Sequence, residues 1–279
     1  MKQRIITGAI LLIALILVLI FAWTPLLPLV IAAASVIGIY EMATCIGLQK
    51  AYVLTIPLYI LASAYPFLLR YFLEKNVLRL IDFIVLMCIP LYFFTIMTFS
   101  GGKYTINDVS VLFTTSFYIF LGFNSLMILY CHRADYGVLL LMAVFIGSWA
   151  TDMFAYFCGV LFGKHKLIPA VSPKKTVEGS VGGTILSTLF MVAFGWVCSM
   201  IIPQVNAHLW VFALGGFVAA IVSQVGDLLM SVIKRTYGIK DYGNIFAGHG
   251  GILDRFDSVL AVSIALASLS SFFNFFEVV

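Results

Sequence analysis

Three aspartates near the end of the chain have the residue type and spacing to hold a metal ion: Asp227, Asp254 and Asp257. Asp254 and Asp257 are three apart after a glycine turn, so they face one way if a helix begins there. Three carboxylates at one membrane boundary repel one another unless cations lie among them. An all-oxygen ligand set favours Mg²⁺ or Mn²⁺ over zinc. The acids therefore predict a divalent-metal site, with salt bridges to Arg235 and Arg255 as the alternative.

Asp227 also begins a polar helix face in the run SQVGDLLMSVIKR. Ser231 and Lys234 follow it at four and seven residues, which places all three side chains on one face of a helix. This face can form a plain ion pair between Asp227 and Lys234. It can equally hold a metal at one level and a phosphate at the next, because Mg²⁺ commonly bridges carboxylates to phosphates.

A second polar run, SPKKTVEG, begins at Ser172. Its proline disfavours helix at Ser172, so Lys174, Lys175 and Thr176 are expected near the start of the next helix. Backbone N–H groups at a helix N-terminus, with lysines beside them, suit an anionic phosphate. The alternative is that these lysines only fix the orientation of the chain in a membrane.

Asp152 lies about ten residues, or roughly 15 Å, from the end of a long apolar stretch, and Tyr156 shares its helix face. An acid at such depth normally faces a partner or a wet cavity, although it can also serve helix packing. Together with the lysines and the three aspartates, it indicates phosphoryl chemistry, which needs positioning and neutralisation of phosphate charge. There is no Walker A motif.

These residues belong to a chain of 279 residues that is 63% hydrophobic and 10% charged. Soluble domains contain about 25% charged residues, so the chain is predicted to be an integral membrane protein. Its continuous apolar runs favour helices over a β-barrel. We therefore expect an all-α polytopic protein with about nine transmembrane helices, near residues 5–22, 26–46, 51–72, 80–99, 109–130, 136–162, 180–202, 208–230 and 258–276.

Charge distribution predicts how these spans are oriented. With the N-terminus in the cytoplasm, cytoplasmic segments hold twelve of the sixteen Lys and Arg residues, as the positive-inside rule requires. The C-terminus then lies on the opposite side, and the loops 163–179 and 231–257 both face the cytoplasm. We expect a single membrane domain, 1–279, with scaffold helices in 1–135 and a catalytic half in 136–279. Glu41 and Asp82 receive no role from the sequence.

The spacing of residues 231–257 resembles the signature of phosphatidate cytidylyltransferases, also called CDP-diacylglycerol synthases. The matching residues are Ser231, Lys234, Arg235, Lys240, Asp241, Gly243, Phe246, His249, Gly250, Gly251, Ile252, Asp254, Arg255, Phe256 and Asp257. Ala247 departs from the signature, which has Pro or Gly there. Asp152, Tyr156, Gly159 and the SPKKTVEGSVGG run also resemble the family.

The resemblance implies that CTP and phosphatidate give CDP-diacylglycerol and pyrophosphate, through attack of the lipid phosphate on the α-phosphorus of CTP. It implies catalytic roles for Lys234, Arg235 and Asp257, and metal ligation by Asp227, Asp254 and Asp257. The ions would be Mg²⁺, with Mn²⁺ as an alternative, and K⁺ as a second ion. Substrate-binding roles are implied for Asp152, Tyr156, Ser172, Lys174, Lys175, Thr176, Glu178, Ser231, Lys240, Asp241, His249, Gly250, Gly251 and Arg255.

The family also implies a homodimer in a bacterial inner membrane, with the active site facing the cytoplasm, membrane lipid around it and no nucleic-acid partner. The main rival is an ion-coupled transporter that uses Asp152 and Asp227 as coupling carboxylates. Transporters are often built from internal repeats, and the spans show no convincing repeat. A CDP-alcohol phosphotransferase is disfavoured because its D-x-x-D-G motif does not occur in the chain.

Overall fold

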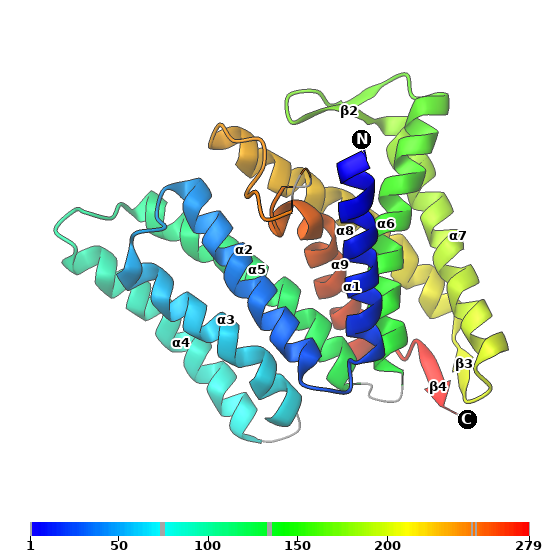
Figure 1. The fold of residues 1–279 in the computed structure, drawn as a ribbon, viewed down its shortest axis with the longest axis horizontal. Helices are drawn as coiled ribbons and strands as arrows, with labels where there is room; N and C mark the ends of the chain where they lie inside the picture. The colour runs from blue at the N-terminus through cyan, green and yellow to red at the C-terminus, as the bar shows by residue number, and fades with distance from the viewer. Residues whose placement is uncertain (1, 73–75, 133–135, 247, 249, 279) are drawn as a thin grey trace. The chain divides into compact units, whose positions relative to one another are not determined.

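The computed structural model describes residues 2–72, 76–132, 136–246, 248 and 250–278. Nine α-helices and four short strands occur in these ranges (Figure 1). The helices are α1 (Lys2–Ile20), α2 (Leu26–Ile46), α3 (Tyr52–Phe72), α4 (Asn76–Phe99), α5 (Ile106–His132), α6 (Gly137–Phe162), α7 (Val177–Ile201), α8 (Leu209–Thr236) and α9 (Leu253–Phe272). The strands are β1 (Lys166–Ile168), β2 (Ser172–Thr176), β3 (Val205–Ala207) and β4 (Phe276–Val278).

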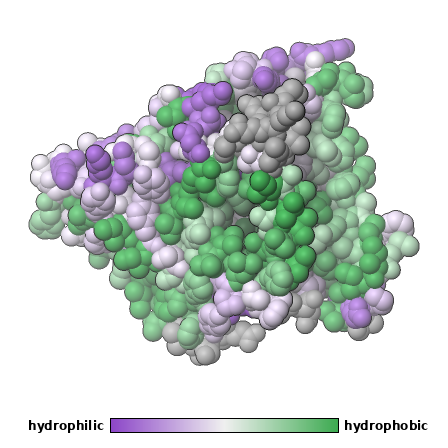
Figure 2. All heavy atoms as spheres, in the orientation of Figure 1, coloured by the Kyte–Doolittle hydropathy of each residue, from purple (hydrophilic) through white to green (hydrophobic). Residues whose placement is uncertain are grey.

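Eight of the described helices are long and apolar enough to cross a membrane, and the apolar part of α1, Thr7–Ile20, is shorter. Large hydrophobic side chains remain exposed on these helices, as a surface in contact with lipid requires. Figure 2 shows this as green over the flanks of the helices. The prediction of an all-α polytopic membrane protein is confirmed, whereas the orientation of its termini stays a prediction.

The last helix begins earlier than the hydropathy of the sequence indicates. We expected a span at 258–276, but α9 runs from Leu253 to Phe272, and residues 276–278 form β4. The charged run Asp254, Arg255 and Asp257 lowers local hydropathy without interrupting the helix. Asp254 and Asp257 therefore lie within the first two turns of α9.

The chain forms two compact units, each described here by itself. The first comprises Met1–Cys131 and Ile239–Asp254, and the second comprises His132–Gly238 and Arg255–Val279. The segment 239–254 thus belongs to the first unit, although it lies in the C-terminal half of the sequence.

In the first unit, prolines interrupt the hydrogen bonding of two membrane helices, and a neighbour compensates at one of them. Pro57 in α3 lacks the N–H that would bond the carbonyl of Val53. The hydroxyl of Tyr92 in α4 donates to that carbonyl at 2.7 Å.

Asp82 of α4 accepts a hydrogen bond from α3: the hydroxyl of Tyr65 donates to Asp82 Oδ1 at 2.6 Å. Asp82 thereby has a packing role between α3 and α4.

In the second unit, α7 packs between α6 and α8. Gly179 and Gly183 allow α7 to approach α6 closely, as their spacing of four residues predicts. A Cβ built on Gly183 would lie 2.9 Å from the backbone nitrogen of Ala155. The antiparallel hairpin β1–β2 connects α6 to α7, and the antiparallel pair β3–β4 joins the start of α8 to the residues after α9. Figure 1 shows β2 at the ends of α6 and α7.

Candidate functional site

A cavity of about 500 Å³ lies in the second unit, between α6, the β1–β2 hairpin, α7 and α8. Its volume falls within the range of about 300–1,000 Å³ that is usual for ligand pockets. Seven of the predicted site residues line it: Asp152, Tyr156, Ser172, Lys174, Lys175, Thr176 and Asp227. The structure therefore brings together the two polar runs that the sequence separates by about fifty residues.

Three further polar residues of the cavity were not predicted: Lys166, Ser180 and Gln224. Lys166 begins β1, and its hairpin partner is Thr176, so pairing of the strands brings this third lysine to the cavity. Gln224 reaches α7, where its amide nitrogen donates to Thr184 Oγ1 at 3.1 Å. Only the spacing of Gln224, three residues before Asp227 on a helix, could have indicated its place.

An ion pair joins the two sides of this cavity. Lys175 Nζ of β2 lies 2.5 Å from Asp227 Oδ2 of α8, and each side chain is about a quarter exposed. Ser231 Oγ donates to Asp227 Oδ1 at 3.3 Å, which confirms that Asp227 and Ser231 share a helix face. An ion pair between Asp227 and Lys234 was one of two alternatives from the sequence; the structure shows that Asp227 pairs with Lys175. A lysine and an aspartate that meet in a cavity can each contact a ligand of opposite charge.

Local hydrogen bonds explain how the hairpin is held. Thr176 is the N-cap of α7, and its Oγ1 accepts from Gly179 N at 3.1 Å. The Glu178 carboxylate accepts from Lys164 N at 3.1 Å and from His165 N at 3.2 Å, and it lies 2.6 Å from His165 Nδ1. Glu178 does not line the cavity described above; in the structure it fixes the turn between α6 and β1. Its predicted contact with substrate stays a prediction.

A second polar cluster in the same unit connects α6 to α9. The hydroxyls of Ser148 and Ser258 lie 2.7 Å apart, and Ser258 Oγ reaches Asp152 Oδ2 at 3.5 Å. Asp257 Oδ1 accepts from Ser258 N at 2.8 Å. Asp257 experiences the like charges of Asp227 and Asp152 and the opposite charge of Lys234. Three carboxylates from α6, α8 and α9 therefore act on one another electrostatically within this unit.

Mutually repelling carboxylates of this kind suit a hard cation, because a bound cation relieves the repulsion. The structure describes no set of three His, Cys, Asp and Glu side chains close enough to share a metal ion. Metal ligation by Asp227, Asp254 and Asp257 accordingly stays a prediction that rests on the all-oxygen donor set.

The signature segment 239–254 lies in the first unit, where a carboxylate organises its backbone. Asp254 is buried, and its Oδ2 accepts from Tyr242 N at 2.8 Å and from Gly251 N at 3.0 Å. Gly250 has φ +81°, a conformation that L side chains rarely adopt. Asp254, predicted as a metal ligand, thus also fixes the turn that precedes α9.

The other predicted residues that the structure describes lie outside the lining of the cavity. Lys234 and Arg235 are in the last turn of α8, and Lys240 and Asp241 are exposed in the segment that follows. Arg255 is exposed in the first turn of α9. His249 falls outside the described residues, so its predicted role stays a prediction.

Glu41 of α2, to which the sequence assigned no role, contacts the segment 239–254 in the first unit.

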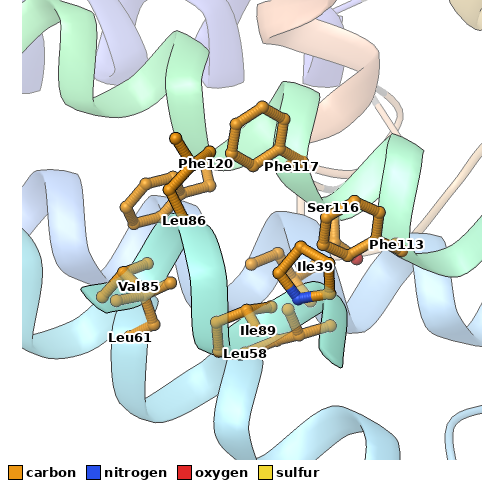
Figure 3. A pocket seen from close by; sticks show the side chains of 11 residues that line it. Ile39, Leu58, Leu61, Val85, Leu86, Ile89, Phe113, Ser116, Phe117 and Phe120 are labelled. Atoms are coloured by element: carbon orange, nitrogen blue, oxygen red, sulfur yellow. The ribbon is translucent and has the colours of Figure 1, made fainter. Parts of the chain in front are cut away.

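A pocket of different character lies among α2, α3, α4 and α5 of the first unit (Figure 3). Its volume is about 210 Å³, and ten of its eleven lining side chains are apolar. The exception is Ser116, whose buried hydroxyl has no hydrogen-bond partner in the part of the chain that the structure describes. A lining without charged groups suits hydrocarbon and not phosphate.

Comparison with known proteins agrees with the chemistry of the polar cavity. Residues 2–273 match the model of the cytidylyltransferase family. A phosphatidate cytidylyltransferase of Bacillus subtilis is 31% identical over 283 residues, which cover 98% of this chain and 99% of that protein. A phosphatidate cytidylyltransferase of Staphylococcus haemolyticus is 39% identical over 170 residues, which cover 58% of this chain and 59% of that protein. The resemblance carried by the signature residues is confirmed.

Proposed function

Because the chain belongs to the cytidylyltransferase family, we propose that it transfers the cytidylyl group of CTP to phosphatidate. A phosphate oxygen of the lipid attacks the α-phosphorus of CTP and forms a new P–O bond. The bond from the α-phosphorus to the bridging oxygen breaks, and pyrophosphate leaves. The products are CDP-diacylglycerol and pyrophosphate. The observation that carries this proposal is the cavity of a membrane-embedded unit in which lysines and aspartates face each other.

The lysines of the cavity are proposed to bind the phosphates. Lys166, Lys174 and Lys175 all line it, and cations near the transferring phosphoryl group stabilise charge that develops in the transition state. Lys175 is held in place by Asp227 before substrate arrives. A phosphate that enters the cavity would compete for Lys175 and leave the Asp227 carboxylate to a different cation. Lys234 and Arg235, at the end of α8, are proposed to steady phosphate oxygens.

Asp227 and Asp257 are proposed to hold Mg²⁺, for which Mn²⁺ could substitute, and K⁺ is proposed as a second ion. Both residues supply carboxylate oxygen, the donor that Mg²⁺ prefers. When bound, the divalent ion would neutralise negative charge on the phosphates and help to orient them. Asp152 lines the same cavity as Asp227 and adds to the negative charge that a cation would neutralise. Asp254 is the third proposed ligand and also organises the turn before α9.

The orientation and assembly of the protein follow as parts of the same proposal. The excess of Lys and Arg in the two polar loops favours a site that faces the cytoplasm, where CTP is found. The phosphate of phosphatidate lies at the headgroup level of the bilayer, so both substrates can reach a cavity at that boundary. A homodimer in a bacterial inner membrane completes the proposal.

The decisive experiment measures pyrophosphate released by the purified chain in lipid-containing micelles with Mg²⁺. We expect release from CTP only when phosphatidate is present, and much less from ATP, GTP or UTP. Phosphatidate with several acyl-chain lengths should be included, since chain preference is set separately from the chemistry. Well-folded protein that releases no pyrophosphate with any of these lipids or with Mn²⁺ would contradict the proposal. Ion-driven uptake by sealed vesicles would then favour the transporter.

A further inference from the structure

Glu41 is a buried acid of α2 that joins this helix to the segment 239–254 through hydrogen bonds. Its side chain is 3% exposed, and it lies in the last two turns of α2. Oε1 accepts from Ile252 N at 2.9 Å, and Oε2 accepts from Leu253 N at 2.9 Å. Burying a carboxylate is costly unless hydrogen bonds satisfy it, and both oxygens of Glu41 are satisfied by backbone N–H groups.

The two N–H groups belong to the start of α9, which begins at Leu253. The first N–H groups of a helix have no partner within the helix and need an acceptor. An N-cap side chain usually accepts from the second or third residue of a helix, so it would leave the N–H groups of Ile252 and Leu253 without an acceptor. Glu41 supplies this cap from a helix more than two hundred residues earlier in the chain.

Two glycines of the signature segment make room for the Glu41 carboxylate. A Cβ built on Gly251 would overlap Oε1 and would lie 2.6 Å from Oε2. A Cβ built on Gly243 would likewise overlap Oε1. Gly251 is not among the glycines with positive φ, in contrast to Gly250 at +81°. The backbone conformation therefore requires glycine at position 250, whereas the neighbouring carboxylate requires it at position 251.

We propose that Glu41 is a positioning residue for the acidic end of α9, and that position 251 is glycine in order to admit it. Glu41 fixes Ile252 and Leu253, and Asp254 follows immediately with its own bond to Gly251 N. Asp257 lies one turn further along the same helix. The direction of the Asp254 carboxylate, within the first unit, is thus set from α2. This inference rests on the proposed function in one respect, that Asp254 acts in the transfer.

The first test replaces Glu41 in the full chain and separates kcat from KM. Glu41→Gln keeps the volume but turns an NH₂ group toward a backbone N–H. We expect kcat to fall about 10- to 100-fold, since small misplacements of reacting groups cost up to about 100-fold. KM for CTP and for phosphatidate should stay within about twofold of the parent values, because uniform binding is unaffected. Glu41→Asp, which keeps two acceptor oxygens, should retain more activity than Glu41→Gln.

Asp108 provides a matched control in the same unit. Its carboxylate also accepts a backbone N–H, from Thr105 at 3.1 Å, but at the exposed start of α5. Asp108→Asn should leave kcat within about twofold of the parent value, as is usual for exposed positions away from a site. An equal fall in kcat for Asp108→Asn and Glu41→Gln, or wild-type kcat for Glu41→Gln, would overturn the proposal.

The second test asks whether Gly251 acts through Glu41. Gly251→Ala should lower kcat at least about tenfold in the parent chain, because its methyl group collides with the carboxylate. In a Glu41→Ala background, the same change should cost no more than about twofold further, since residues that act through one contact are not additive. Effects that multiply independently would instead mean that Gly251 contacts substrate directly, and this part of the proposal would fail.

Hydrogen exchange distinguishes this inference from the proposed function itself. The amides of Ile252 and Leu253 should exchange faster in Glu41→Gln than in the parent chain, whether or not pyrophosphate is released. An inactive parent chain with that exchange pattern would refute the proposed function and leave the cap supported. An active parent chain whose amides at 252 and 253 are unchanged by Glu41→Gln would refute the cap. A lower melting temperature with unchanged kcat of the folded protein would also refute the positioning role.

Discussion

Glu41 of the first unit and Asp227 of the second are both membrane-helix acids, and they use their carboxylates in opposite ways. Glu41 is 3% exposed and gives both oxygens to backbone N–H groups, with two glycines closing around it. Asp227 is about a quarter exposed, lines a cavity of about 500 Å³ and faces a lysine. The backbone N–H groups that bind Glu41 are fixed by the fold, whereas the flexible side chain of Lys175 can move away from Asp227 and bind a ligand. The first arrangement suits positioning, and the second suits exchange of partners during a reaction.

The two pockets show the same contrast on a larger scale. The cavity of the second unit has three lysines and two aspartates in its lining, and the pocket of the first unit has a single hydroxyl. Charged groups that line a cavity can bind ligands of opposite charge. Apolar linings in membrane helices need no such partner. The polar lining supports our proposal that the second unit binds the charged substrates, and the Glu41 contacts support our proposal that the first unit fixes the start of α9.

The largest effect should come from Asp227→Asn, because this substitution removes the negative charge that faces Lys175 in the cavity. An amide carries no charge, so it cannot form an ion pair with Lys175 and binds a divalent cation much more weakly than a carboxylate; we expect turnover to fall by at least about 1,000-fold. The melting temperature should fall by no more than a few degrees, because Asn keeps the volume of Asp and its oxygen can still accept a hydrogen bond from Lys175. Steady-state pyrophosphate release and thermal unfolding of the same preparation measure both quantities. A smaller loss of kcat than that of Glu41→Gln would invert the comparison of the two acids.

An intermediate effect is expected for Glu178→Gln. The Glu178 carboxylate accepts from backbone N–H groups, as that of Glu41 does, but these hydrogen bonds lie at the exposed end of α6. Water can replace the lost hydrogen bonds there, so we expect kcat to stay within about threefold of the parent value. The amides of Lys164 and His165 should exchange faster, because Glu178 accepts from both. A loss of activity as great as that of Glu41→Gln would show that burial does not distinguish the two carboxylates. It would also favour the predicted contact of Glu178 with substrate.

The smallest effect should come from Ser116→Ala in the apolar pocket. The Ser116 hydroxyl is buried without a hydrogen-bond partner in the described structure, and an unsatisfied buried polar group costs free energy. Its removal should raise the free energy of unfolding by about 1 kcal/mol and leave kcat unchanged. Thermal or denaturant unfolding in micelles gives the first value and the pyrophosphate assay the second. Destabilisation by Ser116→Ala would mean that the hydroxyl has a partner, and reduced kcat would connect this pocket to the reaction.

Much of the helical architecture follows from hydropathy, and the errors have physical causes. The expected span 26–46 coincides with α2 (Leu26–Ile46), because a long apolar run between turn residues has one stable state in a bilayer. The expected start at residue 258 misses the true start of α9 at Leu253, because charges reduce hydropathy whether or not they are helical. The hairpin β1–β2 was expected only as a loop, since three to five residues carry too little pattern to predict strands.

The candidate site was predicted in its residues more than in its contacts. Spacing alone placed Asp227 and Ser231 on one helix face, and their hydrogen bond confirms it. The partner of Asp227 was not predictable, because the sequence offers several cations and only the packing of β2 against α8 selects Lys175. Lys166 was missed because it reaches the cavity through the pairing of strands that the sequence did not reveal.

The sequence by itself determined that this is a helical membrane protein, that its charges gather in two segments, and that those segments resemble a cytidylyltransferase. These properties depend on composition and on spacing along the chain, which the amino-acid order states directly. Only the tertiary structure decided that Lys175 meets Asp227 and that Glu41 caps α9. Such contacts join residues tens to hundreds of positions apart, and their partners are selected by helix packing and by the space that glycines leave open.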